Sequence, residues 1–446
     1  MRGVVMGEYF HSVRLIENRC KGCVICAKRC PIEAIRIRGG RAQIIESRCI
    51  DCGECIRRCP THAKTAITDS LEDLAHYKYN IALPAPSLYA QFGIDVRIDN
   101  ILSGLLNLGF DDVFEVAQGA EIVSLAIKDY LRRTDIKRPV ISAACPAVVR
   151  LIQVKFPELI DNLVPIDAPV EVAARVMRAK TSRELGICQD DIGIWFITPC
   201  PAKMTAVKQP LGSEKSNITG TIGISKIYAA LLKSLQNVPA ETERRHASWV
   251  GINWALSGGE SAAVGAENKI VVHEIHSINE VLEQVALGKL AGVDYIETLA
   301  CAGGCIGGPL NVQNRFIAEV NMKLRAEKMK AEDAAKGRVP LQEYRESALG
   351  ANERRAIEPR PILRLDEDIF KAMYKVEVME KTLQRLPGLD CGSCGSPTCK
   401  ALAEDIAQEK ACVTDCVFKL RERVRDLAKE MIDLAEKLPP SLDKDS

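Results

Sequence analysis

The chain has 446 residues, of which 47% are hydrophobic and 27% are charged. This length and composition are typical of a globular protein with two or three domains and exclude an intrinsically disordered chain. A net charge of +1 gives no reason to expect nucleic acid or an anionic membrane as a partner, and no stretch approaches the ~20 apolar residues that a membrane span requires.

The most informative feature is the set of 18 cysteines, most of which lie two to four residues apart. In secreted proteins such a number indicates disulfides, whereas these short spacings suit thiolates that surround a metal cluster. Residues 1–19 lack the basic patch, apolar run and cleavage site of a secretory signal. Because thiolate ligands need reducing conditions, we expect a cytoplasmic protein of an anaerobe or of another reducing cell.

The first two cysteine runs share one spacing, C-x2-C-x2-C-x3-C followed by proline. The spacing resembles that of bacterial two-cluster ferredoxins, in which three close thiolates hold one cubane and the fourth comes from the other run. We therefore predict a ferredoxin-like α+β domain over residues 12–70, with strands over 34–37 and 42–45. One [4Fe–4S] cluster is assigned to Cys20, Cys23, Cys26 and Cys59, and the other to Cys49, Cys52, Cys55 and Cys30. The alternative is two zinc sites, although these usually pair two C-x2-C hooks.

Residues 78–315 alternate apolar strand-like runs with helical stretches, which predicts an α/β domain with a mostly parallel sheet. The expected strands are residues 79–83, 139–143, 192–197, 270–275 and 292–298. The expected helices are residues 98–106, 170–185, 226–235 and 278–287. Cysteines at the carboxyl ends of such strands can converge on one site. We expect four cysteines to converge in this way and to be able to hold a further cubane, namely Cys145, Cys200, Cys301 and Cys305.

These cysteine stretches resemble the three signature motifs of the [FeFe]-hydrogenase catalytic domain. They are S-A-A-C-P over residues 142–146, T-P-C-P-A-K over 198–203 and E-T-L-A-C-A-G-G-C over 297–305. Two further segments agree. Residues 85–87 resemble the segment that lines the family's diiron site, and residues 108–120 resemble the stretch that follows it.

The resemblance implies an H-cluster, which is a [4Fe–4S] cubane bridged through a cysteine to a diiron unit carrying CO, cyanide and an azadithiolate. By residue match, the cubane ligands are Cys145, Cys200, Cys301 and the bridging Cys305. Lys203 matches the lysine that donates a hydrogen bond to one cyanide, a strong acceptor that suits a charged donor. Pro86 and Ser87 match residues near the other cyanide. Glycines at 303, 304, 307 and 308 would let the backbone approach such a cofactor closely.

Several positions depart from the family's pattern, and they concern proton transfer. The first motif has Ala144 where a cysteine usually relays protons, and the second has Ala206 where a glutamate usually follows the lysine. Further on, Ala126 and Ile127 stand where acidic residues are expected. Positioned proton transfer typically contributes ~10²–10⁴-fold to a rate, so this chain would still bind hydrogen but would turn over slowly.

The C-terminal third begins with residues 316–380, whose charge runs predict a solvated helical extension or linker. Residues 383–437 hold a last cysteine run, C-x2-C-x4-C-x16-C, and a closing amphipathic helix over 421–437. The run resembles the small [4Fe–4S] domain of carbon-monoxide dehydrogenase subunits and of sensory [FeFe]-hydrogenases. Its matched ligands are Cys391, Cys394, Cys399 and Cys416, with zinc as the alternative metal. Cys188 and Cys412 match no ligand position, and we interpret both as free or buried thiols.

Together these features predict an [FeFe]-hydrogenase-type oxidoreductase with three accessory [4Fe–4S] clusters and an H-cluster. It would oxidise H2 slowly and reversibly, as a hydrogen or redox sensor. It resembles the sensory groups C and D of the family, although the thirty residues after Cys416 are too few for the PAS domain that many of these relatives carry. The expected partners are H2, protons, H-cluster maturation proteins and a ferredoxin or signalling protein, with no nucleic acid and no membrane.

Three alternatives remain open. The chain could be a ferredoxin-linked metabolic hydrogenase with another proton route, a relative that keeps the cubane but never receives the diiron unit, or a non-catalytic iron–sulfur scaffold or electron carrier. Fast hydrogen evolution from dithionite-reduced methyl viologen would favour the first. Infrared bands from CO and cyanide would exclude the last.

Overall fold

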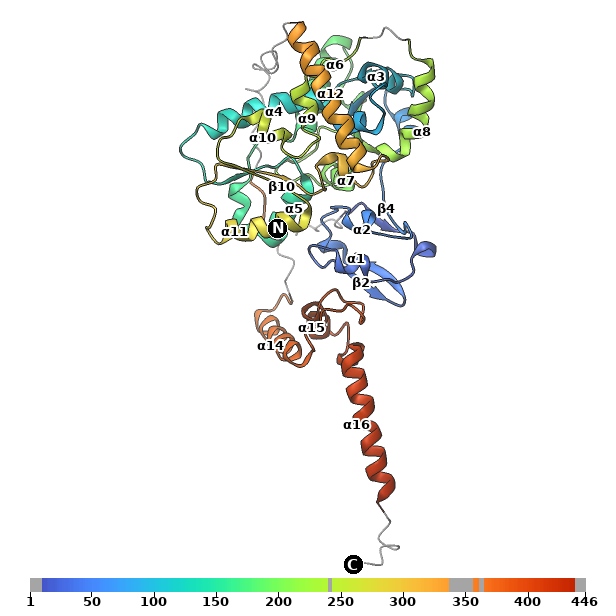
Figure 1. Cartoon of the computed structure of the whole chain (residues 1–446), viewed down its shortest axis with the longest axis vertical. Coiled ribbons are helices and arrows are strands. Elements are labelled where there is room, and N and C mark those ends of the chain that lie inside the picture. Colours follow the sequence, from blue (N-terminus) through green and yellow to red (C-terminus); the bar gives the residue numbers. More distant parts are fainter. Residues whose placement is uncertain (1–9, 240–242, 337–355, 361–364, 438–446) are drawn as a thin grey trace, which may run out of the picture. The chain divides into compact units, whose positions relative to one another are not determined.

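The computed structural model describes residues 10–239, 243–336, 356–360 and 365–437 (Figure 1). The chain divides into two compact units that interleave along the sequence. The first unit comprises Met1–Arg14, Cys49–Arg57 and Lys64–Pro361, and the second comprises Leu15–Arg48, Arg58–Ala63 and Ile362–Ser446. The predicted ferredoxin-like segment 12–70 therefore contributes residues to both units.

The first unit is built around two parallel sheets. Their strands are β5 (Tyr79–Pro84), β6 (Asp112–Val113), β7 (Val140–Ile141), β8 (Ile192–Thr198), β9 (Gly220–Gly223), β10 (Lys269–His273) and β11 (Tyr295–Leu299). One sheet has the order β6-β5-β8-β9 and the other has the order β10-β11-β7. Every strand pairing in both sheets is parallel, which confirms the predicted α/β class. A separate short sheet joins β1 (Val13–Leu15) to β4 (Lys64–Ala66).

Helices separate and cover these strands. They are α2 (Glu54–Arg57), α3 (Ile98–Leu106), α4 (Val116–Leu131), α5 (Pro146–Lys155), α6 (Pro169–Leu185), α7 (Pro201–Lys208), α8 (Ile224–Ser234), α9 (Trp249–Asn253), α10 (Gly259–Val264), α11 (Ile275–Ala286) and α12 (Arg315–Ala335). The four helices predicted from periodicity correspond to α3, α6, α8 and α11, and α3 has the predicted bounds. The helices that were not predicted are α2, α4, α5, α7, α9 and α10.

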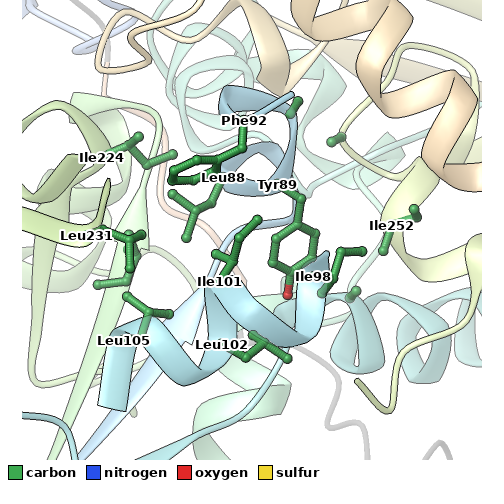
Figure 2. Close-up of a cluster of buried hydrophobic side chains, with 14 of the residues drawn as sticks. Leu88, Tyr89, Phe92, Ile98, Ile101, Leu102, Leu105, Ile224, Leu231 and Ile252 are labelled. Carbon is green, nitrogen blue, oxygen red and sulfur yellow. The ribbon is translucent and has the colours of Figure 1, made fainter. Parts of the chain in front are cut away.

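The larger sheet has a hydrophobic core on each face, because successive side chains of a strand point to opposite faces. On β8, Trp195 and Ile197 belong to one cluster, which includes residues of α3 and α8. Ile194 and Phe196 belong to the other cluster, which includes residues of α6. Figure 2 shows the first cluster, in which side chains of α3 meet those of α8 and of the turn after β5. Burial on both faces explains why β8 is a continuous apolar run rather than an alternating one.

Helix α12 differs from the solvated extension predicted for residues 316–380. Ala318, Met322, Ala326 and Met329 are buried in the first hydrophobic cluster, so the helix belongs to the core of this unit. Their spacing of three and four residues places them on one helical face, which the charged residues between them obscured. Residues 337–355 and 361–364 of the predicted extension lie outside the described residues.

The second unit combines an N-terminal hairpin with C-terminal helices. The hairpin pairs β2 (Ile35–Arg38) with β3 (Arg41–Ile44) in antiparallel fashion, where strands were predicted, and α1 (Ile25–Lys28) precedes it. The C-terminal helices are α14 (Ile369–Arg385), α15 (Cys399–Ala407) and α16 (Val417–Glu436). Leu386, Leu402 and Ala403 form a small core with residues of α14. Among the described helices of both units, none is long and apolar enough to cross a membrane.

Two adjacent leucines of α8 test this packing. Leu231 is fully buried in the first cluster, whereas Leu232 is 48% exposed. We expect Leu231→Ala to lower the free energy of unfolding by about 2–5 kcal/mol, because it leaves a cavity in a close-packed core. Leu232→Ala should change it by less than about 0.5 kcal/mol. Urea unfolding followed by tryptophan fluorescence measures both, and equal effects would contradict the packing of α8.

Candidate active site and cluster-binding residues

Four cysteines follow the carboxyl ends of strands from both parallel sheets. Cys145 follows β7, Cys200 follows β8, and Cys301 and Cys305 follow β11. All four line one cavity of about 100 Å³, together with Pro86, Ala144 and Lys203. The parallel topology therefore brings together three stretches of the chain that are separated by roughly fifty and one hundred residues in sequence.

Two of these cysteines begin helices. Cys145 is the N-cap of α5 and Cys200 is the N-cap of α7, and in each case a proline occupies the first turn. Proline is favoured there because its fixed φ suits the first turn and its missing N–H would be unpaired anyway. A helix N-terminus stabilises negative charge, so both sulfurs lie where a thiolate is favoured.

Burial opposes that charge. Burial and the neighbouring sulfurs Cys301 and Cys145 raise the pKa of Cys200 to about 12. Burial also raises the pKa of Cys301 and raises that of Cys305 well above the usual range. Such thiols stay protonated until a metal binds them, and binding then releases their protons. Four cysteines that line one cavity therefore fit a metal centre better than a redox-active thiol pair.

Arg57 also reaches this group of cysteines, which the sequence did not indicate. Its Nη1 donates a hydrogen bond of 3.2 Å to Cys301 Sγ, and its Nη2 pairs with Glu54 at 2.6 Å. Burial lowers the pKa of Arg57, but the neighbouring Cys301 and Glu54 raise it further than burial lowers it. The guanidinium thus stays charged beside Cys301. Arg57 ends α2, two residues after Cys55 of the second predicted cluster.

Three residues were matched to positions near the cyanide ligands of the diiron unit. Lys203 and Pro86 line the cavity, and Ser87 directly follows Pro86. Lys203 Nζ donates to the carbonyl of Ala144 at 3.0 Å. Ser87 is fully buried, and its hydroxyl has no hydrogen-bond partner among the described residues. A buried hydroxyl without an acceptor costs roughly 1–3 kcal/mol, so the site fits a group that supplies one. Four sulfurs, a lysine and this hydroxyl together fit the H-cluster that the resemblance implies.

The glycines after Cys301 have a packing role besides the predicted approach to a cofactor, which stays a prediction. A Cβ added to Gly304, whose φ is +100°, would lie 2.6 Å from the carbonyl oxygen of Ala255. A Cβ added to Gly308 would lie 2.5 Å from that of Pro199. These glycines therefore allow backbone to pack against backbone around the cavity, and close approach of a cofactor is not needed to explain them.

A buried acidic network lies beside Ala144. Ser142 Oγ accepts from Ala144 N at 3.3 Å and lies 2.8 Å from Glu260 Oε1. Tyr295 donates to the same carboxyl at 2.5 Å. Burial and the nearby charge of Glu297 raise the pKa of Glu260 to about 8. A carboxyl with a strongly raised pKa therefore lies two hydrogen bonds from the backbone N–H of Ala144.

The two alanines at positions where the resemblance predicts a lost proton carrier share a second cavity. Ala144 and Ala206 line a space of about 50 Å³ together with Lys203, Asp167 and Glu171. This space is large enough for water and offers it polar partners. The walls of this space are mostly apolar, and Lys203, Asp167 and Glu171 are among the residues that supply its polar groups.

The accessory runs share a local geometry. In the first run, Ala34 N donates to Cys30 Sγ at 3.2 Å, and in the second, Ala63 N donates to Cys59 Sγ at the same distance. Each donor lies four residues after its cysteine, so the sequence repeat is also a structural repeat. Amide hydrogen bonds of this kind stabilise thiolate ligands and tune the potential of iron–sulfur clusters.

The C-terminal run lies in the second unit, beside the first N-terminal run. Ile37 N of β2 donates to Gly395 O at 2.7 Å, and a Cβ added to Gly395 would lie 2.1 Å from Ile37 O. A Cβ added to Gly392 would lie 3.5 Å from Val24. Since these residues adjoin Cys391, Cys394 and Cys23, the two predicted cluster loops pack against each other. No feature of the sequence linked them.

Buried ion pairs fix this packing. Asp405 of α15 pairs with Arg36 Nε and with Arg38 Nη2, each at 2.7 Å, and Glu404 pairs with Arg48. Removing one partner of a buried pair typically costs about 3–5 kcal/mol, because the other charge stays buried. The C-terminal run is therefore held on the hairpin by charge complementarity as well as by apolar contact.

The two unmatched cysteines are exposed. Cys188 precedes the turn before β8, and Cys412 caps a short 3-10 turn (Val413–Asp415). Cys412 is not part of the helix that follows, because α16 begins only after Cys416. Both therefore remain outside the candidate sites.

Comparison with known proteins identifies three segments. The family described as "Iron only hydrogenase large subunit, C-terminal domain" matches residues 78–270 and 232–309, which together cover more than half of the chain. A 4Fe-4S dicluster domain matches residues 12–60, and an Fe-S cluster domain matches residues 386–418.

Individual relatives are distant. An NADP-reducing hydrogenase subunit of Solidesulfovibrio fructosivorans is 24% identical over 331 residues, covering 60% of this chain and 55% of the relative. Iron hydrogenase 1 of Clostridium pasteurianum is 23% identical over 303 residues, covering 55% and 52%. The chain thus spans about half the length of these relatives. A solved [FeFe]-hydrogenase variant of Chlamydomonas reinhardtii aligns over 66% of this chain and 98% of that chain, with 13% identity and a TM-score of 0.46.

Iron content tests the central site. Cys200→Ser should lower the iron of the purified, anaerobically prepared protein by about four atoms per chain, because a cubane holds four irons. Cys188→Ser is the matched control, since Cys188 is exposed and lies outside the cavity. Iron and acid-labile sulfide analysis measures both variants. Equal iron in the two variants would contradict a cluster at Cys200.

Proposed function

This chain belongs to the iron-only hydrogenase family, and from that membership we propose that it holds an H-cluster and binds and slowly, reversibly oxidises H2. We place it in a reducing cytoplasm as a sensor of hydrogen or of redox state. The observation that carries the proposal is one cavity lined by Cys145, Cys200, Cys301, Cys305 and Lys203, with an alanine where the family's proton carrier stands.

The residues of the site have separate tasks. The four cysteines would hold the cubane, with Cys305 as the bridging ligand to the diiron unit. When bound, the cofactor supplies the redox chemistry of H2 ⇌ 2H⁺ + 2e⁻. Lys203 and the unpaired hydroxyl of Ser87 would hold its cyanide ligands, and Pro86 would close the apolar wall beside them. Arg57 would stabilise the electron-rich sulfur of Cys301.

Electrons would leave or enter through three accessory [4Fe–4S] clusters. Cys20, Cys23, Cys26 and Cys59 would hold one, Cys49, Cys52, Cys55 and Cys30 a second, and Cys391, Cys394, Cys399 and Cys416 the third. The packing of the Gly392 loop against Val24 supports electron exchange between the first and third clusters. The expected redox partner is a ferredoxin or a signalling protein, and maturation proteins would install the diiron unit.

A metabolic hydrogenase with another proton route is the second candidate. The Ser142–Glu260 hydrogen bond favours it, because it brings a titratable carboxyl close to Ala144. An inert methyl group at position 144 therefore does not by itself isolate the site from proton carriers. The two candidates differ in the rate that this network can sustain.

Infrared spectroscopy and a turnover assay test the proposal on the matured, full-length protein. We expect bands from CO and cyanide, and hydrogen evolution from reduced methyl viologen about 10²–10⁴-fold slower than in a relative with the cysteine relay. Ala144→Cys should raise the rate. Absence of the bands would leave an iron–sulfur electron carrier, and fast turnover by the natural chain would favour the metabolic enzyme.

Glu260→Gln separates the two candidates further. Because the raised pKa keeps Glu260 protonated below about pH 8 and ionised above it, a rate that uses this carboxyl as proton donor should fall as pH rises through that value. If the metabolic candidate holds, Glu260→Gln lowers hydrogen evolution by about 10²-fold or more and abolishes that step in the pH profile. Glu121 is another buried carboxyl, and Glu121→Gln should leave the rate of hydrogen evolution and its pH profile unchanged. An unchanged rate in Glu260→Gln would remove the network from the proton route.

A further inference from the structure

Helix α16 presents an apolar face that the described chain does not cover. It is a continuous helix of 20 residues (Figure 1), and none of its residues is buried. A helix of this length gains most of its stability from packing an amphipathic face rather than from intrinsic propensity. The exposed face therefore indicates a packing partner outside the described residues of this chain.

The apolar residues of α16 follow a heptad repeat. Leu420, Val424, Leu427, Met431 and Leu434 are spaced by four, three, four and three residues, and their side chains are 41–71% exposed. A repeat that averages 3.5 residues forms one straight seam on a helix, which buries itself against another helix in a left-handed coiled coil. An ordinary core-facing helix has a broader stripe with a period of 3.6.

The residue types of the seam select the kind of partner. If Leu420, Leu427 and Leu434 occupy the d positions, the a positions hold Val424 and Met431. A β-branched residue at a with leucine at d favours two parallel strands over three or four. Such a seam is complementary to itself, so a second copy of α16 fits it without any further sequence requirement.

The residues that flank the seam do not oppose self-association. In a parallel pair, position g of one helix faces the following position e of the other. Arg423 at g would face position 428, and Glu430 at g would face position 435, and both facing residues are alanine. No like charges therefore oppose each other across these contacts. Within one helix, Arg423 and Glu430 lie 3.9 Å apart as an ion pair.

We propose that the chain forms a homodimer through a parallel two-stranded coiled coil of α16. The seam starts four residues after Cys416, which is the N-cap of the helix. The symmetric pair therefore holds the two C-terminal cysteine runs at the same end of the coil. The proposal rests on the helix alone and does not depend on the hydrogenase activity.

A matched pair of substitutions tests the seam in the full-length, iron-loaded protein. Sedimentation velocity should give a dimer of about 98 kDa, twice the 49.0 kDa chain mass, for the natural chain. Leu427→Lys should shift it to the monomer. Ile432→Lys introduces the same charge at an apolar residue that is 57% exposed but lies off the seam, and it should remain dimeric. Unchanged iron content in both variants shows that folding is intact.

The direction of the two helices is tested with charged partners at position 424. Val424→Glu and Val424→Lys should each be monomeric alone and should form a heterodimer when mixed, because a parallel pair places position 424 opposite itself. The proposal is overturned if the natural chain stays monomeric or forms a trimer or larger assembly. It is also overturned if Ile432→Lys is monomeric, or if only Leu427→Lys, and not Val424→Lys, restores the dimer with Val424→Glu.

Discussion

The constraint on which the first unit depends is the convergence of four cysteines on one cavity. An unpaired thiolate is costly to bury, and here burial raises the pKa of three of the four cysteines. Two helix N-termini and the guanidinium of Arg57 offset part of that cost by placing positive potential at the sulfurs. The arrangement requires the carboxyl ends of both parallel sheets at one site, and this explains why close-packing glycines surround the cavity.

The second unit solves a related problem with charged residues. Its apolar core is small, and the ion pairs that join β2 and the turn Glu46–Arg48 to α15 supply much of the specificity that a larger core would give. Because each arginine would be costly to leave unpaired, the C-terminal run has one favourable position on the hairpin. Two predicted cluster loops, more than three hundred residues apart in the chain, are neighbours for that reason.

Two alanines lie close to a titratable group in the first unit. Ala144 and Ala206 line one mostly apolar cavity, and Ser142 links the backbone N–H of Ala144 to the buried carboxyl of Glu260. Under the proposed function, the rate of proton transfer depends on the local electrostatics of Glu260 as well as on the two alanines. A buried carboxyl whose pKa is strongly raised, as burial and Glu297 raise that of Glu260 to about 8, is common at sites that move protons.

The sequence by itself determined the cysteine spacings, the strand and helix alternation of residues 78–315 and the likeness of three motifs to one family, because these are local patterns. It also placed the helix over 98–106 correctly, since its apolar period is strong. Only the tertiary structure decided that α12 is core rather than linker, that Arg57 reaches Cys301, that Glu260 reaches Ser142 and that Asp405 pairs with Arg36 and Arg38. Each of these contacts joins residues far apart in the chain. The contact is strong because its residues are buried, and they become buried only when the two segments have folded together.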